Sequence, residues 1–198
     1  MSPRYRRALW IALVINAVMF VVEIFGGMRS GSVSLLADAV DFAGDAANYG
    51  LSLAVLSMGL LWRARAALVK GFTMGAYGLF VLGKTLWAAL AGVPPEAITM
   101  GVIGLVALAA NVSVAFMLYA YRDGDANMRS VWLCSRNDAI VNVAIVLAAV
   151  GVFGTGSAWP DLLVAAIVAG LALSAAASVV RQARGEIDQE LVAAGVTR

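Results

Sequence analysis

The sequence predicts an all-α integral membrane protein, a bundle of six transmembrane helices with both termini in the cytoplasm. Its 198 residues are 62% hydrophobic and only 13% charged, with a mean hydropathy of +0.89. A soluble domain is about 45–50% apolar and about 25% charged, so this chain has too few charged groups to cover a water-facing surface. Two further observations are a series of long apolar runs and an alternating distribution of basic residues between them.

Each apolar run is long enough for a spanning helix, which needs about 20 residues because the hydrocarbon core is about 30 Å thick. Helix-breaking residues separate most of the runs, at 29–31, 92–95, 123–125 and 154–157. Only the boundary at 62–65 lacks them. The expected spans are 9–28, 32–61, 67–91, 97–121, 130–153 and 160–180.

Basic residues indicate the orientation of the bundle. They precede the first run, lie between the second and third runs and between the fourth and fifth, and follow the sixth, whereas the other connections contain only Arg29. Because cytoplasmic loops are rich in Lys and Arg, this alternation places both termini in the cytoplasm. The basic residues concerned are Arg4, Arg6, Arg7, Arg63, Arg65, Lys70, Arg122, Arg129, Arg181 and Arg184.

Composition also excludes several classes of function. The formal net charge is only +2, whereas a nucleic-acid-binding protein needs a strongly basic face. Cys134 is the single cysteine, so no intramolecular disulfide can form, and the chain contains no histidine. Any metal site must therefore be built from carboxylate, thiolate or backbone groups.

Several polar or ionisable side chains lie inside the apolar runs. A charged group at the centre of a spanning helix costs about 2.5–3.5 kcal/mol on insertion scales, so such residues are candidates for function. They are Glu23 in the first run, Asp38, Asp41 and Asp45 in the second, Lys84 in the third, and Cys134, Asp138 and Asn142 in the fifth.

Two pairs of these residues have a spacing that suits metal ligands. Asp41 and Asp45 are four residues apart, so they lie on one face of a helix, one turn apart. Cys134 and Asp138 have the same separation. Two facing helices would thus supply four ligands, and tetrahedral coordination by Asp oxygen and Cys sulfur suits Zn²⁺. Without a cation, carboxylates this close repel and take up protons in an apolar bundle, so the predicted site holds either metal or protons.

Residues 31–45 closely resemble the second-helix signature of the cation diffusion facilitator family. That signature is Gly-Ser, then Leu-Leu-Ala-Asp-Ala, then His or Asp, three residues and Asp; here it reads Gly-Ser-Val-Ser-Leu-Leu-Ala-Asp-Ala-Val-Asp-Phe-Ala-Gly-Asp. The fifth helix of the family carries His or Asp, three residues and Asp, and Cys134 to Asp138 falls on that pattern. The run from Asn16 to Glu23 is similar to the family's first helix.

The resemblance implies a divalent-metal/proton antiporter, usually a homodimer, that exports Zn²⁺ or a related ion from the cytoplasm by alternating access. The metal would be the transported substrate, with no prosthetic group. The metal ligands would be Asp41, Asp45, Cys134 and Asp138. We expect a multi-pass protein of the bacterial inner (cytoplasmic) membrane whose partners are the metal ion, protons and lipid.

The chain departs from the family pattern in three places. Cys134 stands where the family usually has His or Asp, and its softer thiolate favours Zn²⁺ or Cd²⁺ over Mn²⁺ or Mg²⁺. The connection 63–70 contains no His or Asp for an accessory metal site. We expect residues 1–184 to form the transport domain and 185–198 a short cytoplasmic tail in place of the family's ferredoxin-like domain.

The same residues also allow other interpretations. The aspartates could be structural, Asp38 is expected to bond a neighbouring helix rather than a metal, and Cys134 could be a small buried apolar residue. Lys84 could pair with Glu23, neutralise an empty site or extend to the outer interface. Further expected helix–helix contacts are hydrogen bonds from Asn16, Asn48, Asn111 and Asn142, and close approach at Gly26, Gly27, Gly71, Gly75 and Gly78.

Two other functions compete with transport. A metal-dependent membrane enzyme such as a phosphatidyl-transferase also has an Asp-rich signature ending in Asp, three residues and Asp. That signature needs an upstream Asp-Gly and Ala-Arg, which do not precede Asp41. The other alternative is a regulatory or structural relative that has lost transport. We predict a transporter without catalytic residues.

Overall fold

The structure is a computed structural model that describes residues 3–54, 60–121 and 126–193. Within these ranges the undescribed side chains are those of residues 52, 60, 61, 63, 66, 70, 126–131, 133, 134 and 193. The described ranges contain helices and no strand, as the all-α prediction requires. The helices are α1 (Pro3–Ser30), α2 (Val33–Ala54), α3 (Leu60–Ala91), α4 (Ala97–Tyr119), α5 (Ala126–Thr155) and α6 (Trp159–Ala193).

Five of the six described helices are long and apolar enough to cross a membrane. The exception is α2, whose 22 residues include three aspartates. This helix is nevertheless the most enclosed one, because it contacts each of the other five and residues 32–40 are all buried. The prediction of a six-helix membrane bundle is therefore confirmed, with the helix that carries three aspartates surrounded by the others.

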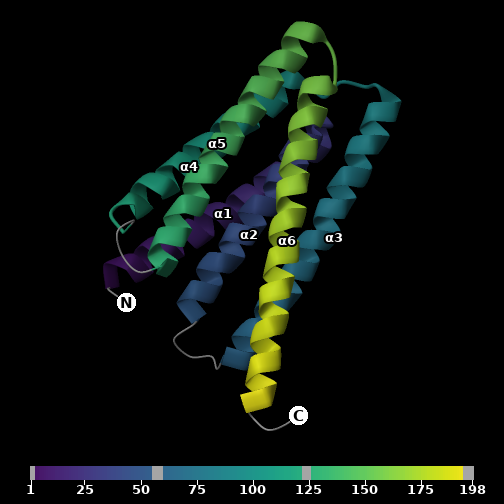
Figure 1. Ribbon diagram of the computed structural model, residues 1–198. Helices are drawn as coiled ribbons and strands as arrows, with labels where there is room; N and C mark the ends of the chain where they lie inside the picture. The colour runs from purple at the N-terminus through teal and green to yellow at the C-terminus, as the bar shows by residue number, and fades with distance from the viewer. Residues whose placement is uncertain (1–2, 55–59, 122–125, 194–198) are drawn as a thin grey trace.

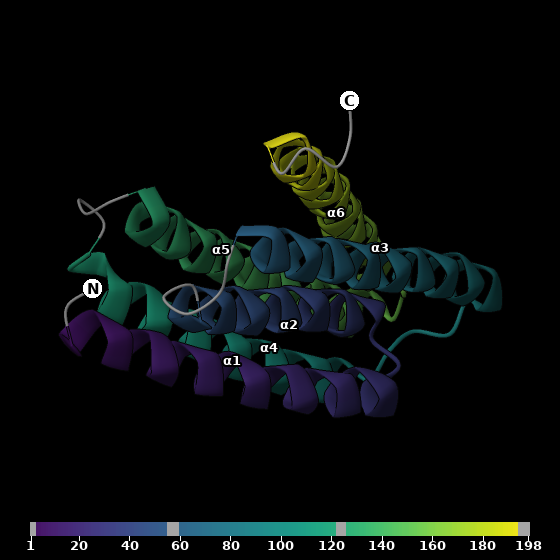
Figure 2. The same ribbon diagram turned by 90° about the horizontal axis from the view of Figure 1, so that it is seen from below.

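The helices pack as three close pairs, α1 with α2, α4 with α5 and α3 with α6. Figures 1 and 2 show the α3–α6 pair along one side of the molecule, with the C-terminal part of α6 leaning away from the rest. Among the described residues, α3 contacts only α6 and α2. The first turn of α1 and the last turn of α6 lie at the same end of the bundle (Figure 1), as an even number of crossings requires.

The basic segment 63–70, which we predicted as a connection, belongs to α3 instead. The difference has a local cause, because Leu, Arg, Ala and Lys are all good helix formers and nothing in the segment stops a helix. The other end of α3 was predicted correctly. Gly92 follows Ala91 with a φ of 66°, the left-handed conformation that commonly terminates a helix.

The start of α2 is held by Asp161, which lies in the first turn of α6 and is 1% exposed. One oxygen of its carboxylate accepts the backbone N–H of Val33 at 2.8 Å. The other accepts the N–H of Ser34 at 3.1 Å and the hydroxyls of Ser32 and Ser34 at 2.7 and 2.6 Å. Ser32 Oγ in turn accepts the N–H of Leu35 at 3.2 Å, as a helix N-cap does. A residue of α6 thus satisfies the otherwise unpaired donors at the start of α2.

Replacing Asp161 should therefore destabilise the fold. Asp161→Ala leaves several buried donors without an acceptor, and we expect a loss of at least about 3 kcal/mol. Thermal unfolding of the purified protein in detergent measures the change. Asp188→Ala, which removes an exposed aspartate from the same helix, is the matched control and should unfold with the wild type. Equal unfolding temperatures for the two variants would contradict the role given to Asp161.

Glycines let α3 and α6 approach closely, as predicted. A Cβ atom on Gly71 would lie 2.7 Å from Cγ2 of Val180 and 3.3 Å from its backbone nitrogen. A Cβ atom on Gly78 would lie 3.0 Å from the side chain of Leu173. The other expected close approaches are Gly26 against Ile103, Gly27 against Leu36 and Gly75 against Ala176.

Adding one methyl group at Gly71 tests how closely α3 and α6 pack. Gly71→Ala should destabilise the protein by about 1–3 kcal/mol, because the backbone of α6 must move to relieve the contact. Gly83→Ala is the control in the same helix, since its Cβ atom meets nothing within 4 Å. Thermal unfolding in detergent should show a lower midpoint for Gly71→Ala only. A similar effect of both variants would mean that helix propensity, and not packing, decides the outcome.

Candidate metal centre

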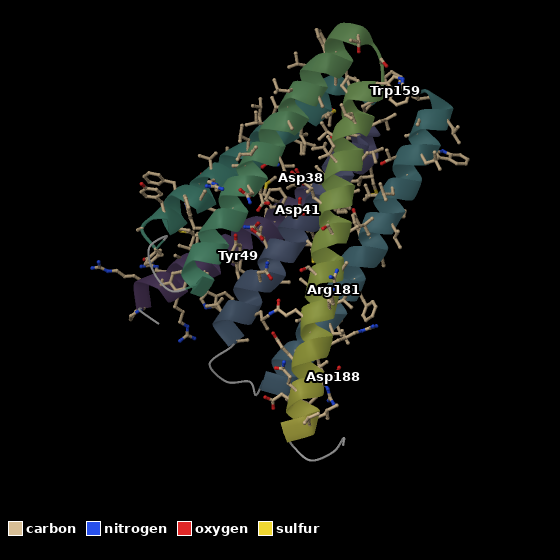
Figure 3. The ribbon with its side chains drawn as sticks, in the orientation of Figure 1. Asp38, Asp41, Tyr49, Trp159, Arg181 and Asp188 are labelled. Atoms are coloured by element: carbon tan, nitrogen blue, oxygen red, sulfur yellow. The ribbon has the colours of Figure 1, made fainter. Side chains whose placement is uncertain are left out.

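One face of α2 carries a stripe of polar side chains, Asp38, Asp41, Asp45 and Tyr49. Their spacing of three or four residues places them one above another on the helix. Asp38, Asp45 and Tyr49 are 0%, 4% and 1% exposed, and Asp41 is half-buried. Figure 3 shows Asp38, Asp41 and Tyr49 in order along the helix, with Arg181 and Asp188 on α6. Carboxylates buried in this way need partners from other helices.

The lower part of the stripe is bonded to α5. The Tyr49 hydroxyl donates to Oδ2 of Asp45 at 2.7 Å, and it lies 2.8 Å from Oγ of Ser135. Ser135 is fully buried, so this contact joins α2 and α5 inside the bundle. The Tyr49 hydroxyl therefore holds the Asp45 carboxylate in one orientation.

The upper part of the stripe is bonded to α5 and α4. Nδ2 of Asn142 donates to Oδ2 of Asp38, and Nδ2 of Asn111 donates to Oδ1 of Asn142 at 2.8 Å. All three side chains are at most 2% exposed. This chain of hydrogen bonds confirms the expectation that Asp38, Asn111 and Asn142 connect helices. One of the two carboxylate oxygens of Asp38 therefore already accepts a hydrogen bond from an amide.

Asp138 brings a carboxylate from α5 to the middle of the stripe. Its carboxyl group faces that of Asp45, within hydrogen-bonding reach when one of them carries a proton, and Asp41 is its next charged neighbour. The predicted ligands Asp41, Asp45 and Asp138 thus lie on facing parts of α2 and α5. No three acidic or sulfur ligands among the described side chains are close enough to hold a metal ion.

Cys134 is the fourth predicted ligand, and its side chain lies outside the described residues. Its backbone is part of α5, one helical turn before Asp138. The two residues therefore share a face of the helix.

The electrostatics of this centre favour a positively charged occupant. Like-charged carboxylates repel, and burial in an apolar bundle removes the water that would screen them. The charged neighbours of Asp138 are the three aspartates of α2, and those of Asp41 are Asp38 and Asp45. A divalent cation or protons would neutralise the cluster, and both can exchange with solution.

Two sequence-based expectations differ from the structure. Lys84 does not pair with Glu23; it is exposed on α3 and lines a cavity of about 330 Å³ beside α1 and α2. Asn16 does not bond another helix; its Nδ2 donates to the carbonyl of Ala12 one turn earlier in α1, at 2.8 Å.

Tyr49, Ser135 and Asp161 were not among the residues predicted from the sequence. Tyr49 and Ser135 could have been suspected from their spacing, four residues after Asp45 and three before Asp138. Asp161 carries no such signal, because it acts on α2 from 127 or more residues away.

The chain matches the family model of the cation efflux transmembrane domain over residues 9–61 and 62–187. Its relatives include the metal cation efflux system protein CzcD of Cupriavidus metallidurans, 25% identical over 82% of this chain and 55% of the relative. They also include a cadmium, cobalt and zinc/H⁺-K⁺ antiporter of Bacillus velezensis, 24% identical over 85% of this chain and 58% of the relative. The zinc transporter ZitB of Pectobacterium atrosepticum is 25% identical over 91% of this chain and 61% of the relative.

The chain spans less than two thirds of the length of these curated relatives. The family model, in contrast, covers nearly all of it, from α1 to α6. A match of that extent, on a six-helix bundle with facing carboxylates in α2 and α5, shows the family: the chain belongs to the cation diffusion facilitators and carries their cation efflux transmembrane domain.

Proposed function

We propose that this protein is a secondary transporter that exports Zn²⁺, or Cd²⁺, from the cytoplasm in exchange for protons. The observation that carries the proposal is that Asp138 of α5 lies opposite Asp45 of α2, with Asp41 as its next charged neighbour, inside a helix bundle of an efflux family. The names of the relatives, among them a zinc transporter and a cadmium, cobalt and zinc antiporter, support the choice of ion.

Exchange follows from the chemistry of this ligand set. Metal arriving from the cytoplasm would bind Asp41, Asp45 and Asp138 as carboxylates and displace their protons. Protons arriving from the other side would neutralise the same oxygens and release the metal. The same side chains would therefore couple the metal flux to the proton flux, because a carboxylate that carries a proton binds the metal less strongly.

Cys134 is the proposed fourth ligand. A thiolate one turn before Asp138 would complete a tetrahedral set of three oxygens and one sulfur, a set that suits Zn²⁺. Because sulfur is a softer ligand than oxygen, it would also strengthen binding of Cd²⁺ relative to Mn²⁺.

Several further features belong to the same proposal. The alternating basic residues support cytoplasmic termini, with residues 1–184 as the transport domain and 185–198 as a cytoplasmic tail. We place the protein in the bacterial inner membrane, as a homodimer with no prosthetic group and no enzyme activity. The metal ion is its substrate.

Metal-driven proton flux in reconstituted vesicles tests the proposal. A Zn²⁺ gradient should change the internal pH, which a pH-sensitive dye reports, for the wild type. Asp45→Asn and Asp138→Asn should abolish the flux, because each removes a proposed ligand and proton acceptor. Asp188→Asn, an exposed aspartate of α6, is the matched control and should transport normally.

Two results would contradict the proposal in different ways. Transport that persists in Asp45→Asn and Asp138→Asn would refute the site. Metal movement without any proton movement in the wild type would refute the exchange and leave the site intact.

Cys134→Ser tests the fourth ligand. We expect the variant to lose affinity for Cd²⁺ far more than for Mn²⁺, because a hydroxyl replaces the soft sulfur ligand without changing the size of the side chain much. Competition binding with the two metals on the purified protein measures the ratio. An unchanged ratio would show that Cys134 is a buried apolar residue and not a ligand.

A further inference from the structure

Glu23 is a fully buried acid outside the proposed metal centre. It lies on α1, is 0% exposed, and neither of its carboxylate oxygens has a hydrogen-bond partner among the described residues. Nearly all buried polar side chains in proteins are hydrogen-bonded, so two unpaired oxygens on one buried acid call for an occupant.

The Glu23 carboxyl group faces that of Asp38 across the α1–α2 contact. The two groups are within hydrogen-bonding reach of each other, but two ionised carboxylates have no proton to share. Asp38 is also 0% exposed; its Oδ2 accepts the N–H of Asn142, whereas its Oδ1 has no partner among the described residues. Three acceptor oxygens therefore meet here without a donor.

The charged groups that interact with the pair among the described residues are acidic. Asp41 lies one turn further along α2, and α3 contributes the Tyr77 hydroxyl. From α5 come the amide of Asn142 and, as a further acidic group that acts on Asp38, the carboxyl group of Asp138, and α4 contributes the amide of Asn111 behind Asn142. The basic residue of α3 in this region, Lys84, is exposed.

We propose that Glu23 and Asp38 form a proton-binding site that is separate from the metal centre, with a single proton held between their carboxyl groups. That proton makes one O–H···O⁻ hydrogen bond, which is the strong, charge-assisted kind, and supplies the missing donor. It also reduces the buried charge of the pair from two to one, and two adjacent carboxylates that share a proton are an established arrangement.

The same geometry disfavours a metal ion as the occupant. Only three free oxygens are present, from two residues, and the Asn142 amide blocks the fourth. A structural or catalytic Zn²⁺ takes four ligands, often with nitrogen or sulfur, and this site offers neither. A proton needs only the two facing oxygens.

Tyr77 gives this site a connection to its surroundings. It lines two cavities beside α2, of about 330 and 350 Å³, and Glu23 is its charged neighbour. One cavity also contains Gly31 and Lys84, toward the start of α2, and the other contains Ala47, toward its end. Tyr77 therefore neighbours both Glu23 and two cavities, one toward each end of α2.

Infrared difference spectroscopy of the full chain in lipid vesicles tests for the shared proton. A protonated carboxyl group has a C=O stretching band that shifts in D₂O. Beside any band from protonated acids of the metal centre, the wild type should show one component that both Glu23→Gln and Asp38→Asn remove. The Gln amide can donate to Oδ1 of Asp38, so Glu23→Gln should fold. Glu96→Gln, an exposed glutamate, is the matched control and should keep the band.

Two further measurements distinguish loss of the shared proton from other effects of the substitution. Thermal unfolding and Cd²⁺ binding should be retained in Glu23→Gln, which separates loss of the proton from loss of the fold or of the metal centre. An acid band of equal size in the wild type, Glu23→Gln and Asp38→Asn overturns the proposal. Because none of these spectra requires transport, failure of the proposed antiport would leave this result standing.

A role for this proton in transport rests on the proposed function. If the site releases its proton in each cycle, Glu23→Gln should move one proton fewer per Zn²⁺ than the wild type in the vesicle assay. An equal proton count would show that the proton stays bound throughout the cycle and would overturn that role.

Discussion

Enclosing three aspartates of α2 in an apolar bundle is the constraint on which the rest of the structure depends. An ionised carboxylate taken from water into such surroundings costs several kcal/mol unless other groups compensate for it. Tyr49 of the same helix bonds Asp45, and neighbouring α5 contributes Ser135 against the Tyr49 hydroxyl and Asn142 beside Asp38. This requirement explains why the helix that carries three aspartates is the one that touches all five others.

A different interaction anchors the start of the same helix. Asp161 lies at the N-termini of both α2 and α6, where a negative charge complements the partial positive charge of each helix end. Since α3 contacts the described part of the molecule only through α6 and α2, this anchor also helps to place the α3–α6 pair. Gly71 and Gly78 of α3 then allow this helix to pack closely against α6.

The stripe on α2 divides into two chemically different layers. Asp45 faces Asp138 of α5 and is oriented by a tyrosine hydroxyl, whereas Asp38 faces Glu23 of α1 and is bonded to an amide. Asp41 lies between them. Carboxylates on one helix thus have different surroundings, because the partners that the neighbouring helices supply differ from one turn to the next.

The sequence by itself determined the helices and the candidate ligands, since hydropathy, helical spacing and helix-breaking residues are local properties. The runs predicted six helices, and the four-residue spacing of Asp41 and Asp45 placed both on one face. The sequence was misleading at 63–70. Basic residues suggested a connection there, but these residues favour helix and the segment belongs to α3. Only the tertiary structure decided that Asp161 caps α2, that Ser135 meets Tyr49 and that Glu23 faces Asp38. Those contacts join distant segments, and their existence depends on how whole helices pack, which no local pattern encodes.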